Sequence, residues 1–181
     1  MTSYSPKSQT RKLEATRITL TSLKPHDDVL GSLYSSIGSP ESVNEWPKML
    51  TDIKSSSDAE DAREKFTSAA KELLGPHDFM IFQEFNHGAW IPMFGAGDGL
   101  KSKRIILGNP LIAITMLQHD VNAGLFVPVQ ILVQEKKEGG TEIFYDLPSG
   151  LIAGVNKDQE LVSAAERLDE KLAALLNDVL S

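Results

Sequence analysis

The 181-residue chain has 41% hydrophobic and 24% charged residues, an ordinary balance for a globular domain. Its net charge of −7, without a basic stripe, argues against a nucleic-acid partner. The absence of cysteine excludes disulfides, thiolate metal ligands and a cysteine nucleophile, and no apolar run of about 18 residues predicts a membrane span. We therefore expect a cytoplasmic protein with no metal, no cofactor, no nucleic acid and no membrane partner.

The N-terminal residues 1–13 are rich in Ser and Thr and lack an apolar core segment, which predicts a disordered tail and not a secretory signal. A mitochondrial presequence stays open as an alternative, although the tail is short and poor in Arg. Alternating residues then predict a strand over 14–23. Pro25 suits the first turn of a helix, and Gly38 is placed to end it.

A helical insertion is predicted at about 38–60, within a single domain that spans 14–181. Pro47 should break or kink this insertion, because proline lacks an N–H donor and crowds the preceding turn. Ser57 and Glu60 have the spacing of a capping box, which predicts Ser57 as the N-cap of the next helix.

The second half of the chain alternates strands with two helices. Segment 86–103 contains four glycines and is predicted to be a loop with little regular structure. A short helix is predicted from Pro110 to about Leu117, and a long one from near Asn156 to about Leu180. The long helix has an apolar stripe made of Leu161, Ala165, Leu168, Leu172, Leu175 and Val179. Strands are predicted over 78–85, 104–108, 127–135 and 141–146.

This order of elements predicts an α+β fold with a mostly antiparallel sheet and helices on one face. Strand ends that open into flexible loops are where binding sites tend to lie. His87 is in such a position, since it ends a strand and opens the glycine loop; the alternative is a histidine that only holds the loop by hydrogen bonds. His26, in a polar first turn, is expected on the surface. No histidine spacing matches a metal site.

The Gly108-Asn109-Pro110 sequence has two interpretations. Asn is a strong N-cap and Pro is favoured at the first helical position, so a helix start explains both residues. A helix N-terminus after a strand can also bind an anion, and Gly108 would let a ligand approach the backbone. Asp146 also has two interpretations, either as a general base or as the turn residue before Pro148.

Four short motifs carry a family resemblance: Asn86-His87, Ile105 to Pro110, Val127-Pro128, and Phe144 to Pro148. With them, the stretch from about residue 14 to 155 resembles the domain of unknown function 302 family. Gly-Asn-Pro, at its distance from the histidine, is the most specific element. The resemblance implies a TATA-binding-protein-like α+β domain with a curved antiparallel sheet of about five strands and a long C-terminal helix. It also implies a homodimer, and no particular reaction.

We expect a small-molecule ligand where His87, the 88–99 loop, the Gly108-Asn109 helix start and Tyr145 converge. The expected ligand-binding residues are His87, Trp90, Phe94, Gly108, Asn109, Tyr145 and Asp146. One alternative is a hydrolase or lyase that uses His87 as base with Asp146 or Glu84 as partner. Another is a homodimeric scaffold or interaction protein.

Overall fold

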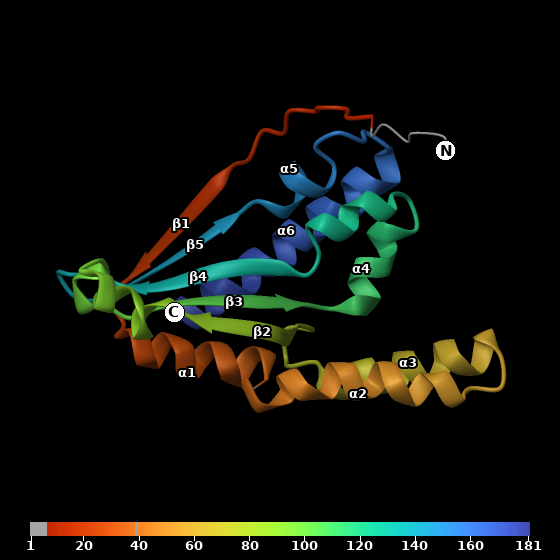
Figure 1. The fold of residues 1–181 in the computed structure, drawn as a ribbon, viewed down its shortest axis with the longest axis horizontal. Coiled ribbons are helices and arrows are strands. Elements are labelled where there is room, and N and C mark those ends of the chain that lie inside the picture. The colour runs from red at the N-terminus through yellow and green to blue at the C-terminus, as the bar shows by residue number, and fades with distance from the viewer. Residues whose placement is uncertain (1–6, 39) are drawn as a thin grey trace, which may run out of the picture.

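A computed structural model describes residues 7–38 and 40–181. Its strands form one sheet in which every pairing is antiparallel, in the order β1-β5-β4-β3-β2 (Figure 1). The predicted α+β architecture is therefore confirmed. The strands are β1 (Arg17–Ser22), β2 (Met80–Asn86), β3 (Ser102–Gly108), β4 (Val129–Glu135) and β5 (Thr141–Asp146).

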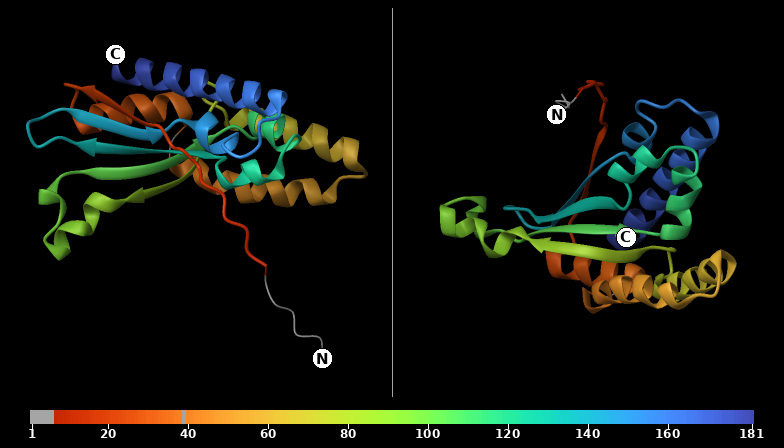
Figure 2. Two further views of the ribbon diagram at one scale, coloured as in Figure 1. Left: turned by 90° about the horizontal axis from the view of Figure 1, so that it is seen from above. Right: turned by 45° about the vertical axis from the view of Figure 1, so that its right-hand side comes forward.

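The helices pack mainly on one face of this sheet. Helices α1 and α6 lie side by side across that face, while α2 and α3 form a pair that extends beyond the end of β2 (Figures 1 and 2). Helices α4 and α5 follow the ends of β3 and β5. The bounds are α1 (His26–Ile37), α2 (Glu45–Asp52), α3 (Ala59–Leu73), α4 (Pro110–Leu117), α5 (Pro148–Ile152) and α6 (Gln159–Leu180).

The core lies between the sheet and α1 with α6. Alternate strand residues face this layer, because successive side chains of a strand point to opposite faces. All six residues of the predicted α6 stripe are buried, and burying each Leu stabilises the fold by about 1.5–3 kcal/mol. The strand residues Ile105, Leu107, Ile131, Val133 and Ile143 complete the layer. The opposite face of the sheet stays partly exposed.

A polar cluster joins α1 to the sheet at the edge of this core. The Tyr34 hydroxyl donates to Glu84 Oε2 at 2.8 Å, and Lys103 Nζ lies 2.9 Å from the Tyr34 hydroxyl and 3.0 Å from Glu84 Oε1. Glu84 is on β2 and Lys103 on β3, so the three side chains hold α1 against two strands.

Three local predictions differ from the structure. The N-cap of α3 is Asp58 and not Ser57, because Asp58 has the extended backbone and its Oδ1 accepts from the N–H groups of Glu60 and Asp61. Pro47 does not break a helix, since it lies in the first turn of α2, where a missing N–H is tolerated. The 86–103 loop contains three 3-10 turns, over His87–Ala89, Ile91–Phe94 and Gly97–Gly99.

The N-terminal tail and the start of the last helix can also be compared with the prediction. The predicted tail, residues 1–13, lies partly outside the described residues, and residues 7–13 are exposed without helix or strand. The last helix begins at Gln159 with Asp158 as N-cap, slightly later than expected. Helix α5 was not predicted.

His26 is buried, contrary to expectation. It is 5% exposed at the start of α1, where its Nδ1 lies 3.2 Å from Asp27 Oδ1. The polar residues around it pointed to the surface, but the ring lies on the core side of the first turn. Gly38 ends α1 as predicted, at a φ of +88° that favours glycine.

Candidate functional site

The register of β2 and β3 separates the two halves of the expected site. Met80 pairs with Gly108 at one end of this hairpin, and Asn86 pairs with Lys103 at the other. His87 follows Asn86, so it lies about 20 Å from Asn109 along the strand direction, at about 3.4 Å per residue. The convergence of His87 with the Gly108-Asn109 helix start was therefore wrong, and the predicted residues divide between two places.

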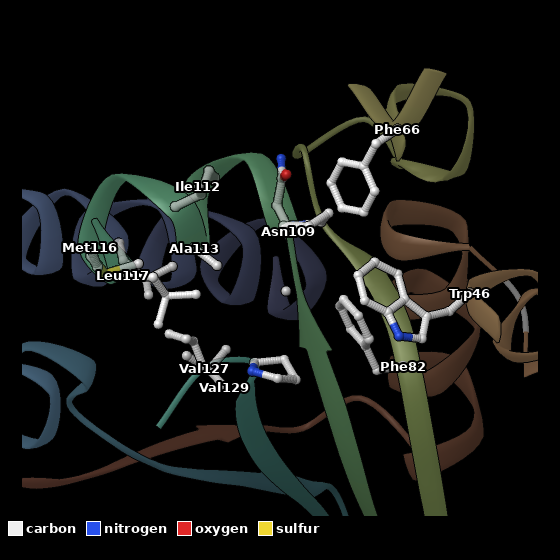
Figure 3. Close-up of a pocket in the computed structure, with 14 residues that line it drawn as sticks. Trp46, Phe66, Phe82, Asn109, Ile112, Ala113, Met116, Leu117, Val127 and Val129 are labelled. Atoms are coloured by element: carbon white, nitrogen blue, oxygen red, sulfur yellow. The ribbon is translucent and has the colours of Figure 1, made fainter. Parts of the chain in front are cut away.

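The first place is an apolar hollow of about 260 Å³ at the start of α4 (Figure 3). Helices α2 and α3 form one wall, the end of β3 and the start of β4 form another, and α4 forms the third. Its lining includes Trp46, Phe66, Phe82, Gly108, Asn109, Pro110, Ile112, Ala113, Met116, Leu117, Val127, Pro128, Val129 and Leu168.

Aromatic side chains build the wall next to the helical insertion. The Trp46 ring on α2 meets Phe82 of β2 edge to face, with centroids 4.9 Å apart, and meets Phe66 of α3 at 5.9 Å. Aromatic pairs prefer this geometry, which adds to the free energy gained from their burial. The insertion thus closes one side of the hollow.

Asn109 and Gly108 have structural roles at this hollow. Asn109 is 8% exposed, and its Oδ1 accepts from the Leu111 N–H at 2.8 Å, as expected for an N-cap. A Cβ on Gly108 would lie 3.0 Å from Pro128 Cβ and 3.5 Å from Phe82 Cε2. Glycine therefore favours the close approach of the chain that enters β4, since a Cβ here would press on Pro128.

The second place is a hollow of about 270 Å³ on the face of the sheet opposite α1 and α6. His87, Tyr145 and Asp146 line it together with Arg17 and Arg104. The Asp146 carboxylate forms an ion pair with Arg17. Arg17 Nε lies 2.5 Å from Asp146 Oδ1, and Arg17 Nη2 lies 3.1 Å from Asp146 Oδ2. Tyr145 is 5% exposed and belongs to the core, and burial raises the pKa of its hydroxyl.

Residues 51–179 match the sequence profile of the family described as "Domain of unknown function DUF302". The chain belongs to this family. A crystal structure of the uncharacterized conserved protein DUF302 from Bacillus stearothermophilus matches with a TM-score of 0.59 and 17% identity, over 90% of this chain and 96% of that one. At this identity the likeness concerns the fold alone. No curated protein matches the sequence.

The DUF302 match covers nearly all of both hollows. Trp46 is the only lining residue of the first hollow that precedes the matched range, and Arg17 is the only one of the second. The helical insertion and β1 therefore each add one side chain to a hollow that the DUF302 segment otherwise builds.

Trp90 and Phe94 of the DUF302 segment line neither hollow. The rings of His87 and Trp90 are 6.1 Å apart, as are those of Trp90 and Phe94, and all meet edge to face. Trp90 is 49% and Phe94 80% exposed. They form an exposed aromatic row with His87, which lines the second hollow.

Within residues 7–38 and 40–181, the His–carboxylate pair required by the enzyme hypothesis is not formed. Glu84 binds Tyr34 and Lys103, and Asp146 binds Arg17. Among the described residues, His87 makes no hydrogen bond to a carboxylate. In the same part of the chain, no three His, Asp or Glu side chains gather as a metal site, and no helix is long and apolar enough to cross a membrane.

Sequence reasoning missed Trp46, Phe66, Phe82 and Arg104. The three aromatic residues come from separate elements, so no spacing along the DUF302 chain connects them. Arg104 did carry a signal, as a cation at the start of the apolar "RIIL" run in a strand.

Proposed function

We propose that this DUF302 domain binds a small apolar or aromatic molecule in the hollow at the start of α4. The observation that supports this proposal is the hollow itself, about 260 Å³ between three walls of apolar and aromatic side chains (Figure 3). Ligand sites are concave and mostly apolar, with few polar groups. This hollow fits that description, since its described lining is apolar or aromatic apart from the Asn109 amide.

The size of the hollow sets the size of the ligand. Apolar cavities of about 150 Å³ take up benzene, and pockets for drug-sized ligands begin at about 300 Å³. A volume of about 260 Å³ therefore suits one ring with a short alkyl chain.

Asn109 holds the wall of the hollow in place and adds little to the binding energy of a ligand. Its Nδ2 donates to the Asp78 carbonyl oxygen at 2.9 Å while its Oδ1 caps α4. Both ends of the amide are engaged, so the ligand gains its affinity from apolar contact with Trp46, Phe82 and the α4 side chains.

Fluorescence of Trp46 tests this proposal. The chain has two tryptophans, so a Trp90→Phe variant leaves Trp46 as the only reporter. Titration with toluene and with butylbenzene should change its emission and saturate. Ala113→Leu fills the hollow from α4 and should raise the Kd at least tenfold.

The matched control is Ala174→Leu, which adds the same atoms to an exposed position of α6. It should leave the Kd within twofold. A titration without saturation, or the same Kd in both leucine variants, would rule out binding in this hollow.

A further inference from the structure

Arg104 lies in the interior of the sheet, on the face opposite α1 and α6. It pairs with Phe85 of β2 on one side and with Leu132 of β4 on the other, and Leu132 pairs with Phe144 of β5. Directly opposed residues of antiparallel strands point to the same face. The four side chains therefore form one row across four strands, in which a single cation stands among three apolar groups.

The Arg104 guanidinium forms no ion pair within residues 7–38 and 40–181. The guanidinium lies over the Phe85 ring, 5.6 Å from Cζ to the ring centroid. Arg17, on the same face, is instead paired with both oxygens of Asp146. Arg104 is half-buried among apolar side chains, and no anionic partner within the described residues accepts from its N–H donors. An anion from outside the chain would supply that partner.

Space for such an anion is present beside Arg104. Two hollows of about 270 Å³ each adjoin on this face and share Arg104, Gln130 and Asp146. Leu132 and Phe144 line one of them. A ligand bound at the Arg104 guanidinium would therefore lie next to the apolar surface of Leu132 and Phe144.

We propose that this face is a second binding site, for an organic monocarboxylate whose anionic group pairs with Arg104 and whose apolar body lies on Leu132 and Phe144. A guanidinium presents parallel N–H donors that match the two oxygens of a carboxylate. The Asp146 carboxylate, which also lines the hollow, disfavours a guest with a second negative charge. His87 also lines this hollow, and its imidazole can carry a positive charge, as the guanidinium groups of Arg17 and Arg104 do.

This site is independent of the apolar hollow at α4, since neither Arg104 nor His87 lines that hollow. Its test is a titration of the ¹⁵N-labelled full chain with benzoate and, in parallel, with benzamide, which has the same ring without the charge. Benzoate should shift the amide resonances of Arg104, Leu132 and Phe144. Benzamide should bind at least tenfold more weakly, because charge-assisted hydrogen bonds are about twice as strong as neutral ones.

Three variants complete the experiment. Arg104→Gln should raise the Kd for benzoate at least tenfold, whereas Arg63→Gln, at an exposed position of α3, should leave it within twofold. Ala113→Leu, which fills the other hollow, should also leave it unchanged. Equal affinities for benzoate and benzamide in the unmodified protein would overturn the proposal, as would shifts confined to the residues around Asn109. The wild-type comparison holds even if Arg104→Gln fails to fold.

Discussion

Asn109 and Asp78 are joined by a hydrogen bond in which Asn109 Nδ2 donates to the Asp78 carbonyl oxygen at 2.9 Å. The same side chain accepts from the Leu111 N–H through Oδ1. One amide thus caps α4 and ties it to the turn that precedes β2. This requires a side chain with both a donor and an acceptor, which explains asparagine here in preference to an ionised Asp, because a carboxylate can only accept.

Loss of this amide should weaken the fold. Asn109→Ala removes a cap and leaves the part-buried hydrogen bond to Asp78 unmade, so the free energy of unfolding should fall by about 1–3 kcal/mol. Asn109→Asp keeps the capping oxygen and loses the donor, so its loss should be smaller, about 1–2 kcal/mol. Urea unfolding followed by circular dichroism measures both.

Asn44 provides the control for these variants. It is the N-cap residue of α2 but makes no capping hydrogen bond with its side chain. Asn44→Ala should therefore change the free energy of unfolding by no more than about 0.5 kcal/mol. Equal losses at Asn44 and Asn109 would show that neither hydrogen bond of the Asn109 side chain contributes to stability.

The Tyr34–Glu84–Lys103 cluster predicts a loss of stability at alkaline pH. Burial raises the pKa of Tyr34. Burial lowers the pKa of Lys103, but its hydrogen bonds with Tyr34 and Glu84 outweigh burial and leave the pKa above its ordinary value. A pKa raised by folding contributes stability that is complete below the ordinary value of about 10 and is lost as the pH rises through the folded value.

Urea unfolding at pH 8 and pH 11 measures this effect. Tyr34→Phe should cost about 1–2 kcal/mol at pH 8 and should reduce the loss between the two pH values. Lys137→Gln, which breaks an exposed ion pair with Asp98, should not change that loss. An unchanged pH dependence in Tyr34→Phe would contradict the prediction.

At Asp169, we expect the negative charge to destabilise the folded protein at neutral pH. Burial raises the pKa of its carboxyl, although the Ser149 N–H donates to Oδ1 at 2.9 Å. The ionised form is thus disfavoured in the folded protein, and this cost is present at neutral pH and disappears as the pH falls below about 4. Asp169→Asn keeps an acceptor for Ser149 and should be more stable than the wild type at pH 7 but not at pH 3. Lower stability of the variant at pH 7 would refute this reasoning.

The exposed residues of the 88–99 loop bear on the predicted homodimer. Met93 and Phe94 are each 80% exposed, and large apolar side chains gathered on a surface often mark an interface. We expect multi-angle light scattering to show a dimer, and Phe94→Ser to shift it toward the monomer. A monomeric wild type at high protein concentration would remove this prediction.

The sequence by itself determined the elements and much of the core. The apolar stripe of α6 and the alternation in β3 to β5 follow from the periods of helix and strand, which are local properties of the chain. Pro110 and Asn109 place the start of α4 because capping also depends only on neighbouring residues. Ser57 and Asp58 show the limit of such reasoning: both side chains can cap, and the backbone conformation selects Asp58.

Only the tertiary structure decided which residues meet. The antiparallel pairing of β2 with β3 sends His87 and Asn109 to opposite ends of a hairpin, although the sequence places each at the end of a strand. Trp46 reaches Phe82 because the start of α2 lies beside β2, and Arg104 forms no ion pair within the described residues because its cross-strand neighbours are apolar. These contacts join residues distant in sequence, so they depend on strand order, register and helix packing, which no local pattern encodes.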